Sequence, residues 1–497
     1  MIMSKHFRAT ATAGLSALVL TFAAAMTGRA QVVEANIRLL PDATAIVDGR
    51  FVGGGEIRNL SFVSHFAGAL DLAERIEGLS LSSVDGERVT FTKFQPGEYI
   101  AASSFDRWSY HIRLKAPRPP AAAAHVSWVG DGSGLLFLND LLPALPASAG
   151  EVMAKIRLEL PAGWTAVPSA GREVAGGVEF RDARDGVILV GRDLRVIVRT
   201  FDSIRAKIAV AGAWQFSNEE LSNAVSEIYS SYRAIFDAEP ADDIRVFVSK
   251  FPTPTQPGNW TADARGSAVT IVSSDMPFKA QSVQRLHEQL RHEMFHLWLP
   301  NAVKLSGNYD WFYEGFALYH SLKTGVALNR IRFEDLLDTL ARAHGIDTLQ
   351  TQRPTLIEAS RLRANVVSNT QVYARGMLVA FLCDLAVLNK SKGKESIETF
   401  TRSVFRTYRN VSPPRDGNDA VLELMRRRPD LVPIVERYIN GRDEIGWQSD
   451  LLAAGIESTR NNYVTTLKVK EKPNGRQKAI LDKLGYNSWR RLPANSR

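Results

Sequence analysis

One short stretch constrains this chain more than any other. Residues His292-Glu293-Met294-Phe295-His296 follow the pattern H-E-x-x-H inside a segment that reads as a helix. Side chains four residues apart lie above one another on a helix, so both imidazoles can reach one metal ion while Glu293 lies beside them. A hydrolytic zinc site needs this arrangement, with two neutral histidines as ligands and a carboxylate that moves a proton.

A second segment can complete the metal site. Pro300 ends the first helix, a polar loop follows, and a new helix-like run begins with WFYEGF. Catalytic zinc takes three protein ligands and leaves a fourth position for water, and a carboxylate on a neighbouring antiparallel helix can be the third. Glu314 lies eighteen positions after His296. We therefore predict His292, His296 and Glu314 as the ligands of one Zn²⁺ per chain.

These residues resemble the gluzincin aminopeptidases. HEMFHLWLPN is similar to the H-E-x-x-H-x-W-x-x-N of aminopeptidase N, with Trp298 and Asn301 in register, and WFYEGFA is similar to its W-x-x-E-G-F-A. A third block, Val372-Tyr373-Ala374-Arg375-Gly376 before an apolar helix, resembles the family's Y-x-K-G. The glycyl aminopeptidase family is the most similar, over most of the chain after the first thirty residues. The resemblance implies a metallopeptidase with a thermolysin-like catalytic domain.

The proposed chemistry gives two residues catalytic roles. Glu293 would take a proton from the attacking water and pass it to the leaving amine. Tyr373 would donate a hydrogen bond to the developing oxyanion, since its hydroxyl stays protonated at neutral pH. A tyrosine on the edge of the core is the alternative for Tyr373. His287 and His320 are spaced so that they face away from the metal. Trp298 and Asn301 are expected to orient the site.

The substrate-binding residues are the least defined part of the site. In the resembled family a stretch reading G-L-E-H-R-N-S supplies a glutamate that binds the free amino terminus of the substrate. The corresponding residues here are Thr261-Ala262-Asp263-Ala264-Arg265-Gly266-Ser267. Asp263 and Arg265 are therefore candidate substrate-binding residues, although Asp263 is one methylene shorter than a glutamate. The alternative is a surface turn in which Asp263 has no role.

The rest of the chain predicts a multidomain α+β fold. Short alternating segments favour an N-terminal all-β domain, and apolar residues at helical spacing favour a C-terminal helical domain. About forty residues follow the segment LLAAGI, which is too few for the PDZ module common in the resembled family, so no PDZ module is expected. The expected segments are a signal peptide (1–30), the β domain (31–205), the catalytic domain (206–325), the helical domain (326–465) and a basic tail (466–497).

Composition bears on location and partners. A basic start, an apolar run of about 14 residues and small residues after it are typical of a secretory signal peptide, which predicts a secreted or periplasmic enzyme. An uncleaved anchor is the alternative, and we expect no stable membrane insertion.

The formal charge is +8, but nine Lys or Arg and two acidic residues lie after residue 465, so seven of these charges belong to the predicted tail. A solvated tail is favoured over a nucleic-acid surface. The single cysteine, Cys383, is expected in the core.

The pattern as a whole predicts an exported zinc metallopeptidase that acts on a peptide or protein substrate, at or near a free amino terminus. Two alternatives remain. One is an endopeptidase or other amide hydrolase on the same scaffold, and the other is a noncatalytic peptide-binding protein. The complete set of His292, Glu293, His296, Glu314 and Tyr373 argues against the last, since binding alone would not need all five. The sequence does not indicate an oligomeric state.

Overall fold

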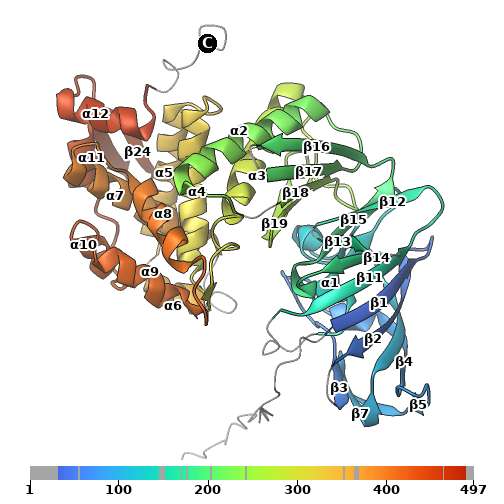
Figure 1. Cartoon of the computed structure of the whole chain (residues 1–497). Coiled ribbons are helices and arrows are strands. Elements are labelled where there is room, and N and C mark those ends of the chain that lie inside the picture. The colour runs from blue at the N-terminus through green and yellow to red at the C-terminus, as the bar shows by residue number, and fades with distance from the viewer. Residues whose placement is uncertain are drawn as a thin grey trace, which may run out of the picture.

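The computed structural model describes residues 32–53, 56–144, 151–169, 171–174, 177–201, 204–240, 243–350, 353–362, 369–462 and 464–487. A β-rich part lies at one end of the molecule, a helical part lies at the other, and a five-stranded sheet with two helices lies between them (Figure 1). This confirms the predicted multidomain α+β organisation. The predicted signal peptide lies outside the described residues.

The N-terminal part is built of three antiparallel-rich sheets around one core. The largest has the strand order β13-β14-β11-β1-β2-β8-β4-β5, and the others are β12-β15-β10-β9 and β3-β7-β6. Burial alternates along β1, as expected for a strand with one face toward the core. The strands are β1 (Val32–Leu39), β2 (Thr44–Val52), β3 (Ile57–Ser61), β4 (Ile76–Ser82), β5 (Arg88–Val89), β6 (Phe91–Gln95), β7 (Glu98–Phe105), β8 (Arg107–Arg113), β9 (Trp128–Val129), β10 (Ser133–Phe137), β11 (Met153–Glu159), β12 (Trp164–Pro168), β13 (Arg172–Val174), β14 (Gly177–Phe180) and β15 (Val187–Arg192).

Short helical turns connect these strands. They are η1 (Leu72–Arg75), η2 (Pro120–Ala124), α1 (Leu138–Leu141) and η4 (Ala183–Asp185). The segment from residue 70 to 81 contains both a helical turn and a strand, because η1 runs directly into β4. Two of the turns matter for the site. η2 packs on the sheet of the middle part, and α1 follows β10 at the boundary between the two parts.

The middle part is a five-stranded sheet in the order β16-β17-β18-β20-β19. Its strands are β16 (Arg195–Phe201), β17 (Ile204–Val210), β18 (Asp243–Ser249), β19 (Trp260–Arg265) and β20 (Ala268–Ser273), and its helices are α2 (Asn218–Phe236) and α3 (Lys279–His296). Ser217 and Glu220 form a capping box at the start of α2. β19 is an edge strand that pairs only with β20 among the described strands.

One domain boundary and one segment differ from the sequence-based expectations. β16 and β17 belong to the middle sheet, because β17 pairs in parallel with β18, so this part begins at Arg195 and not at residue 206. The segment around Asp263 is strand β19 and not a surface turn. The segment WTADAR does alternate apolar and polar residues, but the sequence analysis did not identify it as a strand, and in the structure all six of its residues are partly buried.

The C-terminal part is mainly helical. Its helices are α4 (Asp310–Ala327), α5 (Phe333–Thr348), α6 (Leu356–Leu362), α7 (Asn369–Ser391), α8 (Ile397–Tyr408), α9 (Gly417–Arg426), α10 (Val432–Ile434), the single wide turn η5 (Val435–Ile439), α11 (Gln448–Ala454) and α12 (Gly475–Leu484). Two short strands, β21 (Leu305–Ser306) and β22 (Arg415–Asp416), pair in parallel, and β23 (Ile456–Asn461) and β24 (Val464–Val469) form a hairpin. The elements α9, α10 and η5 do not form one continuous helix, because Pro429 and Pro433 each lack the N–H that a continuous helix needs.

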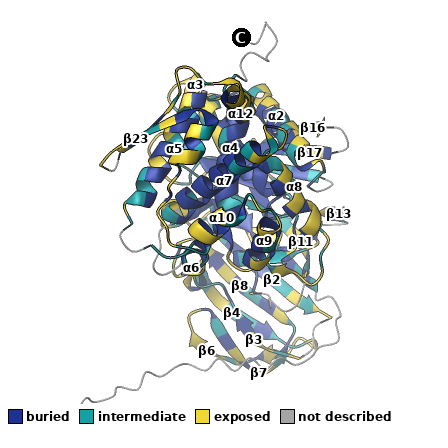
Figure 2. Ribbon diagram, turned by 90° about the vertical axis from the view of Figure 1, so that its left-hand side faces the viewer, coloured by how far each residue is buried: buried dark blue, intermediate teal, exposed yellow. Residues whose placement is uncertain are grey.

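α7 is the central helix of this part. It packs against α4, α5 and α11, and Figure 2 shows it buried in the middle of the helical part. Residues Thr370–Ser391 are long and apolar enough to cross a membrane by length and composition, and 83% of the most apolar window is buried inside the protein. That burial is typical of a core helix. Cys383 lies on α7 and is buried, as predicted.

The predicted basic tail is partly wrong. β24 begins at Val464, and α12 buries Ile480, Leu481 and Leu484, so the chain up to Tyr486 is folded. Apolar residues at helical spacing outweigh the surrounding lysines, because those lysines lie on the solvent side of the helix. Residues 488–497 lie outside the described part. At the start of α9, the side chain of Asp416 accepts a hydrogen bond from the Asp419 amide and caps the helix.

Candidate active site

The predicted metal ligands come from two adjacent helices. α3 carries His292 and His296, and α4, which packs against it, carries Glu314. The chain reverses direction in a turn between the two helices, and Asn301 fixes the position of this turn. The side-chain nitrogen of Asn301 donates to the carbonyls of Ala264 and Gly266 at 3.0 and 3.1 Å. Asn301 therefore joins the end of the metal-binding helix to strand β19, which is the orienting role expected for it.

The three candidate ligands converge on one point. Nε2 of His292 lies 3.2 Å from Oε2 of Glu314, Nε2 of His296 lies 3.6 Å from the same oxygen, and the two Nε2 atoms lie 3.3 Å apart. Zinc bonds of about 2.0–2.2 Å in tetrahedral geometry separate the ligand atoms by roughly 3.3–3.6 Å. Within the described residues, this is the one group of His, Cys, Asp and Glu that could hold a metal ion. The residues present fit zinc.

The tautomer of one ligand is set by its surroundings. Nδ1 of His296 lies 3.0 Å from the carbonyl oxygen of Leu299, so this nitrogen carries the proton and donates it. The other ring nitrogen, Nε2, then presents its lone pair to the point where the three ligands meet. A hydrogen bond at the far nitrogen is the usual way that proteins orient a histidine ligand. His287 and His320, by contrast, bond to Glu227 and Thr401, away from the site, as predicted.

The ligand set is electrostatically coupled. Burial acts to lower the pKa of His296, but the Glu314 carboxylate outweighs burial and the pKa rises to about 9. Burial acts to raise the pKa of Glu314, but His296 and His292 hold it well below its usual value. These opposite pKa shifts mean that the Glu314 carboxylate stabilises positive charge at the imidazole nitrogens. A divalent cation supplies such charge and leaves both histidines neutral.

Glu293 lies beside the ligands and is 5% exposed. Burial raises the pKa of its carboxyl above the usual value. A higher pKa makes the carboxylate a stronger base, which suits the proton transfer predicted for it. Tyr373 of α7 lines the same cleft. The structure therefore brings the two predicted catalytic residues and the three predicted ligands together.

The cleft has a volume of about 450 Å³, which is within the usual range for ligand sites. Helices α3, α4 and α7 supply one group of lining residues, strand β19 supplies another, and the N-terminal part supplies one. They are His125, Trp260, Thr261, Ala262, Asp263, Ala264, His292, Glu293, His296, Pro300, Asn301, Tyr313, Glu314 and Tyr373. A substrate laid along β19 would pass beside the metal ligands.

The comparison with solved structures identifies the fold, whereas two other comparisons find no match. No family model matches the chain, and no curated protein matches it. Among solved structures, an aminopeptidase N family protein from Idiomarina loihiensis is 14% identical, with a TM-score of 0.74, over 86% of this chain and 79% of that one. An M1 zinc metallopeptidase from Deinococcus radiodurans, in a mutant form bound to a Tyr-Ser-Ala substrate, is 14% identical, with a TM-score of 0.54, over 84% of this chain and 95% of that one. The chain has the aminopeptidase N fold.

Only one of the two candidate substrate-binding residues faces the cleft of this aminopeptidase N fold. Asp263 lines the cleft, whereas Arg265 does not and lies behind it. Nε of Arg265 donates to the Asp263 carboxylate. Burial acts to raise the pKa of Asp263, but Arg265 and His125 outweigh it and the pKa is lower than usual. Asp263 is therefore ionised and already paired.

Three lining residues were missed by the sequence analysis. Tyr313 precedes Glu314 and packs its ring against His296, so its place next to a ligand was a usable signal. Trp260 lies on a strand that the pattern did not reveal. His125 had no signal, because only the packing of η2 against β19 brings it to the cleft.

Proposed function

We propose that this chain is a zinc-dependent metallopeptidase that hydrolyses peptide bonds with a water molecule. The observation that carries the proposal is the convergence of two imidazole nitrogens and one carboxylate oxygen within bonding distance of a single ion. Glu293 lies beside them and Tyr373 lines the same cleft. The aminopeptidase N fold and the sequence resemblance support the same assignment.

The chemistry divides among the residues of the cleft. Bound zinc would lower the pKa of water to about 7 and polarise the substrate carbonyl. His292, His296 and Glu314 would hold the ion. Glu293 takes a proton from the attacking water and returns it to the leaving amine. The hydroxyl of Tyr373 donates a hydrogen bond to the oxygen on which negative charge develops.

The resemblance favours an aminopeptidase, and this is the first candidate for specificity. The solved relative from Deinococcus radiodurans was bound to a peptide with the sequence Tyr-Ser-Ala, which supports a peptide substrate here as well. An endopeptidase is the second candidate, because the carboxylate in the position expected to bind an amino terminus, Asp263, is paired with Arg265.

We also propose that the enzyme is exported. The support is the basic start and the apolar run of about 14 residues near the N-terminus, which are typical of a signal peptide. Fractionation of expressing bacterial cells, with N-terminal sequencing of the mature chain, tests this. We expect the activity in the periplasm or medium and a first residue near position 31. Activity confined to the cytoplasm would contradict it.

Substitution of the predicted base tests the peptidase function. Glu293→Gln keeps the size of the side chain but cannot accept the proton, so kcat should fall by about 100- to 10,000-fold while bound zinc, measured by mass spectrometry, stays at one per chain. Glu288→Gln is the matched control, because Glu288 is exposed on the same helix. Equal turnover by Glu293→Gln would contradict the mechanism, and a zinc-loaded wild type with peptide binding but no turnover would favour the noncatalytic alternative.

A further inference from the structure

The N-terminal part contributes one side chain to the cleft, and that side chain is His125. It directly follows η2, whose residues pack on β19 and β20. The hydroxyl of Thr261 donates to the Ala121 carbonyl at 2.6 Å, and Nη2 of Arg265 donates to the His125 carbonyl at 3.1 Å. The segment from Ala121 to His125 is thus attached at both ends to the strand that lines the cleft.

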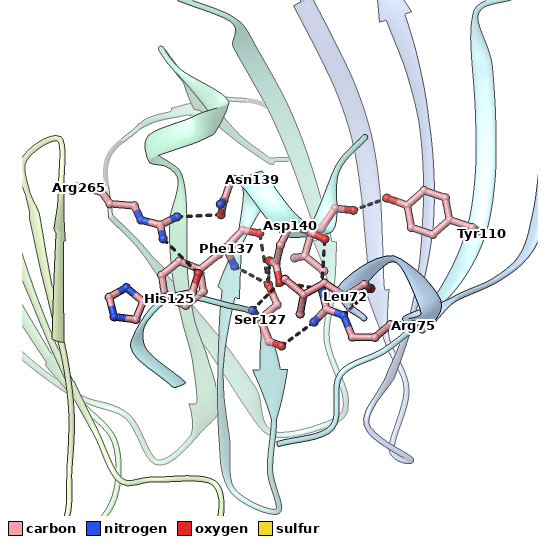
Figure 3. A network of polar contacts seen from close by, with 10 residues as sticks. Leu72, Arg75, Tyr110, His125, Ser127, Phe137, Asn139, Asp140 and Arg265 are labelled. Carbon is pink, nitrogen blue, oxygen red and sulfur yellow. Dashed lines mark hydrogen bonds and ion pairs between the residues drawn. The ribbon is translucent and has the colours of Figure 1, made fainter. Parts of the chain in front are cut away.

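Arg265 makes several contacts where the N-terminal part meets strand β19. Its Nη1 donates to the side-chain oxygen of Asn139 at 2.8 Å, and its guanidinium lies 4.8 Å from the ring centre of Phe137. Asn139 is itself fixed, because its neighbour Asp140 is buried between Ser127 and Arg75. Figure 3 shows two neighbouring groups of polar contacts, one around Arg265 and one around Asp140, which are joined through the backbone because Asn139 and Asp140 are consecutive residues. His125 is therefore a preorganised group in the cleft.

The charge around Asp263 is already balanced. Arg265 donates to one carboxylate oxygen, and Nδ1 of His125 lies 3.7 Å from the other. An arginine stays protonated at any working pH, so the carboxylate has a permanent counter-ion. Asp263 is also the only carboxylate among the described lining residues apart from Glu293 and Glu314, which the metal chemistry uses. A substrate ammonium would find no unpaired carboxylate at this end of the cleft.

A peptide group suits this end better than an ammonium. Nδ1 of His125 faces Asp263, so Nε2 is the ring nitrogen left for a substrate, and it can form one hydrogen bond to a peptide group. An ammonium would also need a negative charge to compensate its own, and the Asp263 carboxylate is already paired with Arg265. The His125 side chain is 24% exposed, which leaves its ring accessible from the cleft.

We propose that His125 is a specificity-determining residue, whose imidazole hydrogen-bonds to a peptide group on the amino-terminal side of the scissile bond. The cleft then accepts substrates whose amine is acylated, including internal peptide bonds, and does not require a free amino terminus. The inference rests on the proposed peptidase function and names its substrate class.

Paired substrates test the inference. Fluorogenic tripeptides are assayed with the amino terminus free or acetylated, using zinc-loaded wild type and His125→Ala, His125→Gln and His111→Ala. We expect the wild type to cleave the acetylated peptides at least as fast as the free ones. His125→Ala should lower kcat/KM for acetylated peptides by about 3- to 10-fold, mainly through KM, the loss expected for one hydrogen bond. His125→Gln, which keeps a donor and an acceptor, should recover most of it. His111→Ala, on the exposed surface of the same part, should have no effect.

Binding gives a second readout that does not depend on turnover. In the Glu293→Gln background, the dissociation constant of the acetylated peptide should rise about 3- to 10-fold with His125→Ala. Cleavage of free peptides only, or an equal loss on both forms with His125→Ala, would overturn the inference and leave the peptidase function standing. No cleavage of either form by the zinc-loaded wild type would overturn the peptidase function and the inference together.

Discussion

At the scale of single residues, Tyr373 is the catalytic assignment most open to experiment. Its ring lines the cleft with the metal ligands and Glu293. A donor aimed at a developing oxyanion acts in the transition state and not on the bound substrate, so its loss should lower kcat and leave KM nearly unchanged.

Tyr373→Phe removes that donor and keeps the ring. We expect kcat to fall by about 100- to 1000-fold, measured by steady-state kinetics with zinc content checked in parallel. Tyr486→Phe, at a partly buried tyrosine that packs on Phe333, is the control. A Tyr373→Phe enzyme with wild-type kcat would show that this tyrosine is a core-edge residue.

His320 is a buried residue outside the site, with a consequence for stability. The Thr401 hydroxyl donates to the Ile397 carbonyl and accepts from Nε2 of His320, so the ring is held neutral in the core. Burial lowers the pKa of His320 from 6.5 to about 4. Between these values the unfolded chain binds the proton and the folded chain does not, so the free energy of unfolding falls as the pH falls from 6.5 toward 4.

His320→Gln keeps a donor for Thr401 and removes the titration. The slope of the unfolding free energy between pH 6.5 and 4.5 should become shallower by up to about 1.4 kcal/mol per pH unit. Urea denaturation at several pH values measures it, with His111→Gln, at an exposed histidine, as the control. An unchanged slope would mean that His320 titrates normally in the folded protein.

At the scale of elements, the site depends on how closely α4 and α7 approach each other. A Cβ added to Gly376 would lie 2.2 Å from the Trp311 carbonyl oxygen, and one added to Gly315 would lie 2.4 Å from the carbonyl carbon of Gly376. These two glycines let the backbones meet next to Glu314 and Tyr373. They are the glycines of the two sequence blocks WFYEGFA and VYARG, so the motifs encode helix packing as well as chemistry.

Gly376→Ala should force the two helices apart. We expect a loss of about 1–3 kcal/mol of stability, the usual cost of overpacking, and weaker zinc binding because Glu314 moves with α4. Thermal unfolding and competition with a chelator measure the two effects. Gly475→Ala in α12, where an added Cβ meets open space, is the control. Wild-type stability and zinc affinity in Gly376→Ala would contradict the close approach.

At the scale of the whole molecule, Arg265 joins the N-terminal part to the cleft. Its guanidinium contacts Asp263, Asn139 and the His125 carbonyl, and its side chain is 11% exposed. Removing one partner of such a buried pair leaves the other charge uncompensated, at a typical cost of about 3–5 kcal/mol. Arg265 is thus a positioning residue that acts through its neighbours.

Arg265→Gln should lower the stability of the whole chain and raise KM more than it lowers kcat, because the wall of the cleft moves while the metal ligands stay in place. Calorimetry and steady-state kinetics measure these effects. Arg113→Gln is the control, since Arg113 forms an exposed pair with Glu77 that should contribute little. A drop in kcat with unchanged KM would place Arg265 in the chemical step instead.

The sequence by itself determined the metal site and the class of fold. Ligands spaced by four residues on one helix share a face whatever surrounds the helix, so His292, Glu293 and His296 could be read directly. Apolar periodicity is equally local, which is why the C-terminal helical domain was predicted.

Tertiary structure alone decided what faces the ligands across the cleft. Strand β19 is an edge strand whose six residues are all partly buried, and His125, which lies beside Asp263, comes from a point 138 residues earlier in the chain (263 minus 125). Contacts between distant segments depend on the packing of whole parts, and local patterns do not encode them. The sequence was therefore enough to predict the metal ligands and Glu293, and only the fold placed strand β19 and His125 opposite them.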